Sequence, residues 1–297
     1  MKLLSDLLKK LSNLDRRYLY LMLAIVIAIP LLVPVVSKPL PKPAITSFTK
    51  SYYDAIEGVA NDPAAKNKIA IVACNFAAGT LAENLSQCEA TVRHLMMRKV
   101  KFAIFGFSDP QGRELGQQVV DKLAKEYDYQ YGRDYVNWGY RPAGASVALI
   151  KSAVNDLPGA LGKDTRGTNV ADVPCMAGIK GVNDVSLIVE IASASTYGVW
   201  IQFYQRAGKQ PIPTLYCPTS VMATEAIPKL DSGQLQGMLV GLKGASEYEL
   251  LLKAEGFASS ASASLSLSHL LILVLIVLGN LGMFMERKQR ALAEGGR

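Results

Sequence analysis

The residues best placed to do chemistry are polar side chains that follow short apolar runs in the middle of the chain. In open parallel sheets, ligands bind at the carboxyl ends of the strands, so we expect these side chains to share one rim of a sheet. Residue types that cap helices are also common at strand-to-helix turns, so capping alone could account for the pattern. The strand ends offer, besides Glu190, the candidate ligand-binding residues Asn75, Ser108, Asp109, Ser193 and Thr219.

Nucleophilic catalysis by cysteine requires a base within reach of the thiol. The chain has only two histidines, and His269 lies at the edge of an apolar stretch, so His94 is the one candidate base, in the middle of an expected helix. Close Cys or His pairs of the zinc-binding kind are absent from the sequence, as is a glycine-rich phosphate loop. We therefore expect no catalytic residue, no metal and no cofactor, and an enzyme is the weaker interpretation.

The four cysteines fall in the central part of the chain, at positions 74, 88, 175 and 217. Outside the cytoplasm disulfides can persist, and four cysteines permit three pairings that the sequence does not distinguish. Free buried thiols are an equal alternative, because Cys74 and Cys217 end apolar runs.

Apolar runs alternate with amphipathic helical patterns between residues 66 and 256, which predicts the elements that position these side chains. A parallel sheet covered by helices on both faces requires such an alternation. We therefore predict a doubly wound, mostly parallel α/β sandwich. The alternation of strands and helices resembles one lobe of the periplasmic binding-protein folds. The strands are expected at 68–74, 100–107, 130–135 or just beyond, 184–192 and 211–217.

Two segments could contact a partner. Residues 131–141 concentrate aromatic rings and arginines, which are over-represented where partners bind, although an aromatic cluster under a loop is an equal alternative. From this segment Arg141 is a further ligand-binding candidate, and Trp138 and Tyr140 are interface candidates. In residues 234–253, three glycines recur at helical spacing and would let another backbone approach closely, either in this domain or in a second subunit: Gly237, Gly241 and Gly244.

The uncharged stretches 18–36 and 265–285 are each long enough to cross a bilayer as a helix. Lys and Arg flank both stretches on their outer sides, so both tails, 1–17 and 286–297, are expected in the cytoplasm and the region between the spans outside it. The first stretch is read as an uncleaved anchor, with a cleaved signal peptide as the alternative. Residues 3–14 are amphipathic and could form an interfacial helix or a short coiled-coil seam. Two connecting segments complete the division, a spacer and helix at 37–65 and a small-residue linker at 257–264.

The positive charge of the chain is mainly a consequence of this topology. The tails contribute +3 and +2 of the formal +7, so only +2 remains for everything between them. A nucleic-acid-binding domain would gather Lys and Arg on one face, and the sequence has no such run, so nucleic acid is not an expected partner.

These features predict a membrane-anchored, non-enzymatic scaffold or interaction module with an extracytoplasmic α/β domain. Its expected partners are the lipid bilayer and either copies of itself or another membrane protein. The alternative is an extracytoplasmic domain that binds a small molecule and signals through a separate partner, because the tails are too short to hold an output domain.

Overall fold

The computed structural model describes residues 15–33, 35 and 42–294. The chain divides into two compact units, Pro43–Ala258 and a second unit drawn from Met1–Lys42 and Ser259–Arg297. The predicted amphipathic segment 3–14 and most of the proline-rich spacer lie outside the described residues.

The larger unit is built on one sheet of six strands, all parallel, in the order β3-β2-β1-β4-β5-β6. From β1 the chain adds β2 and β3 on one side of the sheet, and it then adds β4, β5 and β6 on the other side of β1. Doubly wound dinucleotide-binding folds have the same strand order. The α/β parallel-sheet prediction is thus confirmed. The strands are β1 (Ile69–Asn75), β2 (Phe102–Gly106), β3 (Tyr135–Tyr140), β4 (Val185–Ala192), β5 (Thr214–Pro218) and β6 (Gly237–Met238).

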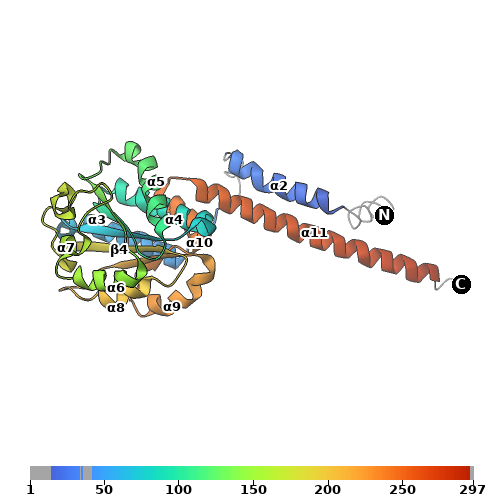
Figure 1. The fold of residues 1–297 in the computed structure, drawn as a ribbon. Coiled ribbons are helices and arrows are strands. Elements are labelled where there is room, and N and C mark those ends of the chain that lie inside the picture. Colours follow the sequence, from blue (N-terminus) through green and yellow to red (C-terminus); the bar gives the residue numbers. More distant parts are fainter. Residues whose placement is uncertain (1–14, 34, 36–41, 295–297) are drawn as a thin grey trace. The chain divides into compact units, whose positions relative to one another are not determined.

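Helices cover both faces of the sheet, as continuous burial of the central strands requires. Figure 1 draws α4, α5 and α10 above the sheet and α6, α8 and α9 below it. Two large apolar clusters fill the two layers, one around Tyr52 and Cys88 and the other around Trp138 and Trp200. The first layer contains α3 (Ser47–Asn61), α4 (Leu81–Met97), α5 (Pro110–Tyr127) and α10 (Gly241–Leu252); the second contains α6 (Ala143–Ser152), α7 (Leu157–Leu161), α8 (Tyr197–Phe203) and α9 (Ala223–Asp231).

The three glycines predicted to form one helical stripe do not lie on one helix, which corrects that prediction. Gly237 belongs to strand β6, Gly241 begins α10 with a φ of +59°, and only Gly244 is inside that helix. Each meets atoms of its own unit: a Cβ on Gly237 would lie 2.3 Å from the Tyr52 backbone nitrogen. Close backbone approach explains Gly237 and Gly244, which meet backbone atoms of the same domain, whereas Gly241 meets the side chains of Ser220 and Glu83.

The long segment between α6 and β4, residues 153–184, is called the excursion here, and it consists of short helical turns rather than a further strand or a long helix. It contains α7 and three 3-10 turns, η4 (Val170–Asp172), η5 (Pro174–Met176) and η6 (Val182–Asp184). Its apolar side chains complete the second layer, and the Thr165 backbone donates to the Asn137 carbonyl of edge strand β3 at 3.0 Å. The excursion therefore covers the open edge of the sheet next to β3.

The second unit contains α2 (Arg16–Leu32) and α11 (Phe257–Glu294). Among the described residues, one helical segment of 29 residues, Phe257–Met285, is long and apolar enough to cross a membrane, and an 18-residue stretch within it has a mean hydropathy of 2.3. Helix α11 includes the whole of the predicted linker 257–264, so this segment is helical. The Ser264 hydroxyl donates to the Ile27 carbonyl of α2 at 2.9 Å, so the two helices are in contact.

Candidate functional site

Asn75 ends β1 at the point where the strand order reverses, and its side chain ties three strands together. The amide oxygen accepts hydrogen bonds from the backbone nitrogens of Phe107 and Ser108, at 2.8 and 2.9 Å, just beyond β2. The amide nitrogen donates to the Glu190 carboxyl of β4 at 2.7 Å. Asn75 is 1 % exposed, and its bonds to Phe107 and Glu190 are buried, while the bond from Ser108 lies at the edge of the buried region.

Glu190 is a fully buried carboxyl group at the centre of this arrangement. Besides Asn75, the indole nitrogen of Trp200 donates to it at 2.7 Å and the hydroxyl of Thr196 also donates to it. Burial raises the pKa of Glu190 from its ordinary value of 4.5 to about 7, against the lowering effect of hydrogen bonds from Thr196, Asn75 and Trp200. The group therefore titrates near neutral pH inside the sheet.

This network occupies the position at which doubly wound folds bind their ligands. Side chains from β1, β4 and α8 fill the switch point and satisfy one another, so the carboxyl is enclosed rather than presented to a substrate. The arrangement can hold or release a proton at Glu190 and fixes the strand ends to one another. It offers no surface at which a small molecule could contact Glu190 directly.

The raised pKa predicts a specific pH dependence of stability. Glu190 binds its proton more tightly in the folded chain, so its contribution is fully present below about pH 4.5 and is lost as the pH rises through about 7. Each pKa unit corresponds to about 1.4 kcal/mol, so the loss should be roughly 3 kcal/mol. We expect the urea midpoint of Glu190→Gln to fall less than that of the wild type between these pH values. Tryptophan fluorescence can report unfolding, because both tryptophans lie in the larger unit, and parallel profiles would contradict the prediction.

The other predicted strand-end residues lie along the same carboxyl edge but act locally. Asp109 caps α5 by accepting from the Gln111 backbone nitrogen at 2.8 Å, as the capping alternative expected. Ser108 is exposed, Ser193 is half-buried just after β4, and Thr219 is buried beside the end of β5. Of the predicted set, only Asn75 belongs to the Glu190 network.

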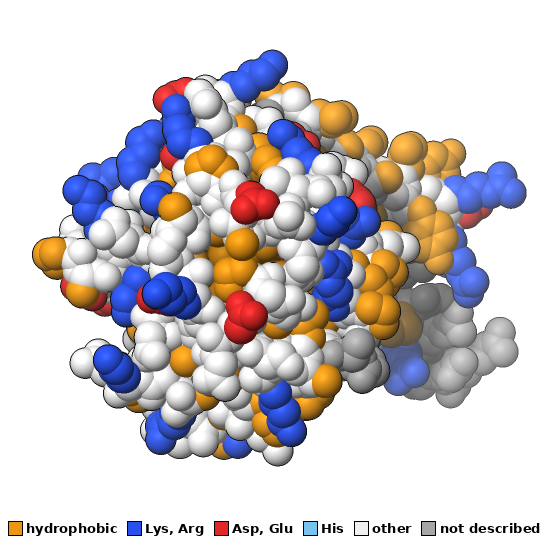
Figure 2. All heavy atoms as spheres, turned by 60° about the vertical axis from the view of Figure 1, so that its left-hand side comes forward, with side chains coloured by type: hydrophobic (Ala, Val, Ile, Leu, Met, Phe, Trp, Pro, Cys, Tyr) orange, Lys and Arg blue, Asp and Glu red, His pale blue; other side chains and the backbone are white. Residues whose placement is uncertain are grey.

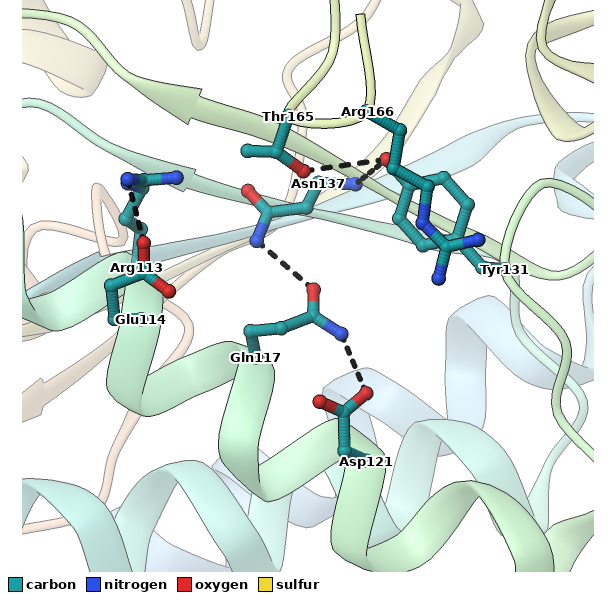
Figure 3. A pocket seen from close by; sticks show the side chains of 8 residues that line it. All are labelled: Arg113, Glu114, Gln117, Asp121, Tyr131, Asn137, Thr165 and Arg166. Carbon is teal, nitrogen blue, oxygen red and sulfur yellow. Dashed lines mark hydrogen bonds and ion pairs between the residues drawn. The ribbon is translucent and has the colours of Figure 1, made fainter.

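A separate polar cavity of about 390 Å³ lies beside edge strand β3. Figure 3 shows its walls, with Arg113 on one side, Arg166 and Tyr131 on the other, and Gln117 and Asn137 between them. A second cavity of about 310 Å³ shares Arg113 and Thr165 with the first. The lining side chains, supplied by α5, the segment between α5 and β3, β3 itself and the loop after α7, are those of Arg113, Glu114, Gln117, Asp121, Tyr131, Asn137, Thr165 and Arg166.

A chain of hydrogen bonds fixes the floor of this cavity. The Gly139 backbone nitrogen donates to the amide oxygen of Asn137 at 2.9 Å, and Asn137 donates to Gln117 at 3.0 Å. Gln117 in turn donates to the Asp121 carboxylate at 2.8 Å. The amide groups are therefore oriented before any ligand arrives, while Asn137 itself is 2 % exposed.

The predicted candidates from the aromatic segment have structural positions. Arg141 donates to the backbone carbonyls of Leu161 and Lys163 at 2.8 and 3.1 Å, which ties the excursion to the end of β3, and it also lines the second cavity. Trp138 is 1 % exposed and packs on Phe105, so its side chain leaves no surface for a partner. Tyr140 is half-buried at the strand end.

The thiols and the histidine do not form a nucleophilic pair. All four cysteines are free and buried, and burial raises the pKa of Cys217 to about 12. His94 instead contacts the Tyr248 hydroxyl and, at 2.8 Å, the Glu57 carboxylate. Burial lowers the pKa of His94, so in the neutral ring Nε2 donates to Glu57 and Nδ1 accepts from Tyr248. Within the described residues, no group of three His, Cys, Asp or Glu side chains could hold a metal ion.

No family model, curated protein or solved structure matches this chain. Sequence reasoning named Asn75 and Glu190 but missed Trp200, which reaches the carboxyl from a helix. It also missed the cavity, for which one signal was available: Arg113, Gln117 and Asp121 recur every four residues and so share one face of α5.

Proposed function

We propose that this chain is a membrane-anchored, non-enzymatic interaction module whose α/β unit lies outside the cytoplasm, within a homo- or hetero-oligomeric membrane complex. The observation that carries the proposal is the filled switch point. Where doubly wound enzymes keep a crevice for a cofactor, Asn75, Glu190 and Trp200 bond to one another in the protein interior. A domain built in this way presents its outer surface, rather than an internal crevice, to other molecules.

Membrane attachment is supported by the second unit. Large apolar side chains of α11 such as Leu273, Val277 and Phe284 are exposed, as expected for a surface that faces lipid. Small side chains at Ser260, Ser264 and Ser268 are buried at intervals of four residues, and close helix pairs in membranes use this spacing. The bond from Ser264 to α2 supports a paired helical anchor, and the Lys and Arg residues that flank the two apolar stretches support tails in the cytoplasm.

The surface of the larger unit supports a protein partner better than nucleic acid. On the face shown in Figure 2, several Lys and Arg side chains lie close together at the upper left edge, and the others are spread out among uncharged atoms, so no continuous basic patch covers the face. A nucleic-acid-binding face would gather these side chains into a patch or stripe.

Labelling of introduced cysteines in intact cells tests the topology, since the four native thiols are buried and should give little background. We expect a membrane-impermeant maleimide to label Ser51→Cys, in exposed helix α3, without permeabilisation. Arg16→Cys and Arg287→Cys, on the two exposed helix ends, should react only after permeabilisation. Labelling of either tail variant in intact cells, or protection of Ser51→Cys, would contradict the proposed topology.

A small-ligand-binding or sensory role is the second candidate, and the cavity of Figure 3 favours it. Its volume lies within the range of small-molecule sites, and its polar groups are held in place by the protein itself. In a sensory role, the domain would signal through a partner protein.

A further inference from the structure

We propose that the cavity of Figure 3 binds a small organic dianion, with one carboxylate at Arg113 and the other at Arg166. The inference rests on the second candidate function, and it names the chemical class of the ligand. That class follows from the hydrogen-bond donors and acceptors that the protein leaves open in the cavity.

Arg113 provides the first open donor. Its side chain is 27 % exposed, and its Nε is buried without a hydrogen-bond partner among the described residues. Its ion pair with Glu114, at 2.6 Å, involves a carboxylate that is 57 % exposed, and pairs of this kind contribute little. Because the Nε is enclosed by the protein, a ligand in the cavity would contact the terminal nitrogens of the partly exposed guanidinium group.

Arg166 provides the second open donor on the opposite wall. Its guanidinium carbon lies 3.6 Å from the centre of the Tyr131 ring, which holds the group in place by a cation–π contact. Tyr131 is fixed in turn, because its hydroxyl donates to the Asp164 carboxylate at 2.8 Å. Within the described parts of the chain, Arg166 makes no ion pair. A planar guanidinium held in this way is suited to a carboxylate, which it can bind with two parallel hydrogen bonds.

The groups between the two arginines are already committed. The nitrogens of Asn137 and Gln117 donate within the chain that runs to Asp121. The remaining donors are therefore concentrated at the two ends, and they are cationic. A linear molecule with an acidic group at each end matches that arrangement better than a neutral polyol, which would need open donors and acceptors along its length.

Asp121 sets a limit on the affinity and gives the proposal a sharp test. Its carboxylate is exposed at the cavity wall and, like that of Glu114, would repel an anionic ligand. Asp121→Asn keeps an oxygen to accept from Gln117 while it removes the charge, so it should tighten the binding of a dianion. A ligand with a positive group would give the opposite change.

The experiment is calorimetric titration of the detergent-solubilised full chain with succinate, with the uncharged succinamide as the matched probe. We expect succinate to bind and succinamide not to bind. Arg113→Gln and Arg166→Gln should each weaken succinate roughly ten- to a hundredfold, as expected for the loss of hydrogen bonds to a charged group. Asp121→Asn should strengthen binding. Lys125→Gln removes the same charge from an exposed position of α5 outside the cavity and should leave binding unchanged.

Several outcomes would overturn the proposal. The proposal is wrong if succinate at millimolar concentration gives no heat of binding, or if succinamide binds as tightly as succinate. It is also wrong if Lys125→Gln weakens succinate binding as much as the arginine variants do, or if Asp121→Asn weakens it. Unchanged thermal unfolding of each variant without ligand separates loss of binding from loss of fold. None of these outcomes bears on the labelling pattern at Ser51, Arg16 and Arg287, so the binding site and the membrane topology can fail independently.

Discussion

Asn75→Ala is expected to lower the free energy of unfolding by about 3–5 kcal/mol, because it leaves the buried Phe107 nitrogen without a partner and removes one of the three donors to the buried Glu190 carboxyl. The backbone nitrogens of Phe107 and Ser108 would lose their shared acceptor, and Glu190 would lose its amide donor. The measurement is urea unfolding followed by tryptophan fluorescence. Ser108→Ala, at an exposed neighbouring position, is the control and should change stability by about 0.5 kcal/mol or less.

A second substitution at the same position separates the acceptor role of Asn75 from its donor role. Asn75→Asp keeps an oxygen for the two backbone nitrogens but places a second carboxyl beside Glu190. Two carboxylates within hydrogen-bond distance of each other repel, so ionisation of both is unfavourable. The variant should therefore lose stability more steeply than the wild type as the pH rises through about 7. If Asn75→Ala costs less than about 1 kcal/mol, the network does not hold the strand ends together.

Gly237→Ala is expected to cost more than about 4 kcal/mol or to prevent folding, which is the largest effect anticipated for a single added methyl group. The new Cβ would lie 2.3 Å from the backbone nitrogen of Tyr52 and 2.4 Å from its Cα, so helix α3 would have to move away from β6. The matched control is Gly58→Ala, in the same helix α3, where nothing lies within 4 Å of the added atom. That change should stabilise the helix by about 0.8–1 kcal/mol.

Comparison of Gly237→Ala with Gly58→Ala also distinguishes packing within one chain from contact between chains. If Gly237→Ala melts like the wild type but dissociates an oligomer, the glycine serves a subunit interface and its assignment to packing within the domain is wrong. Gly241→Leu should be destabilising for a related reason, since the residue has a φ of +59° and an added Cβ would lie 2.0 Å from the Ser220 hydroxyl.

The sequence predicted the central strands well because each is buried on both faces and reads as a continuous apolar run. Strand β3 lies just beyond residues 130–135, and a positive φ at Gly139 and a register shift interrupt its pattern. Strand β6 has two residues, too few for any periodicity, and its glycine matched a helical spacing by coincidence. Local pattern could not reveal a strand that exists only because β5 pairs with it.

The candidate site was only partly predictable for the same reason. Asn75 could be named because a polar residue at the end of an apolar strand is visible in the sequence. Its bond to Glu190, 115 residues away, depends on β1 and β4 being neighbours, and the strand order is a tertiary property. The cavity depends in addition on a loop around Thr165 that crosses the edge strand, and no sequence pattern predicts its path.

The proposal that the chain works as an interaction module in a membrane complex is tested most directly by the mass of the detergent-solubilised full chain. Size exclusion with light scattering, followed by native mass spectrometry, measures protein mass and reports co-purifying proteins and small molecules. We expect a discrete oligomer or a defined complex with another membrane protein. A monomer without a protein partner would contradict the proposal, and a monomer carrying a small acidic molecule would favour the ligand-binding function instead.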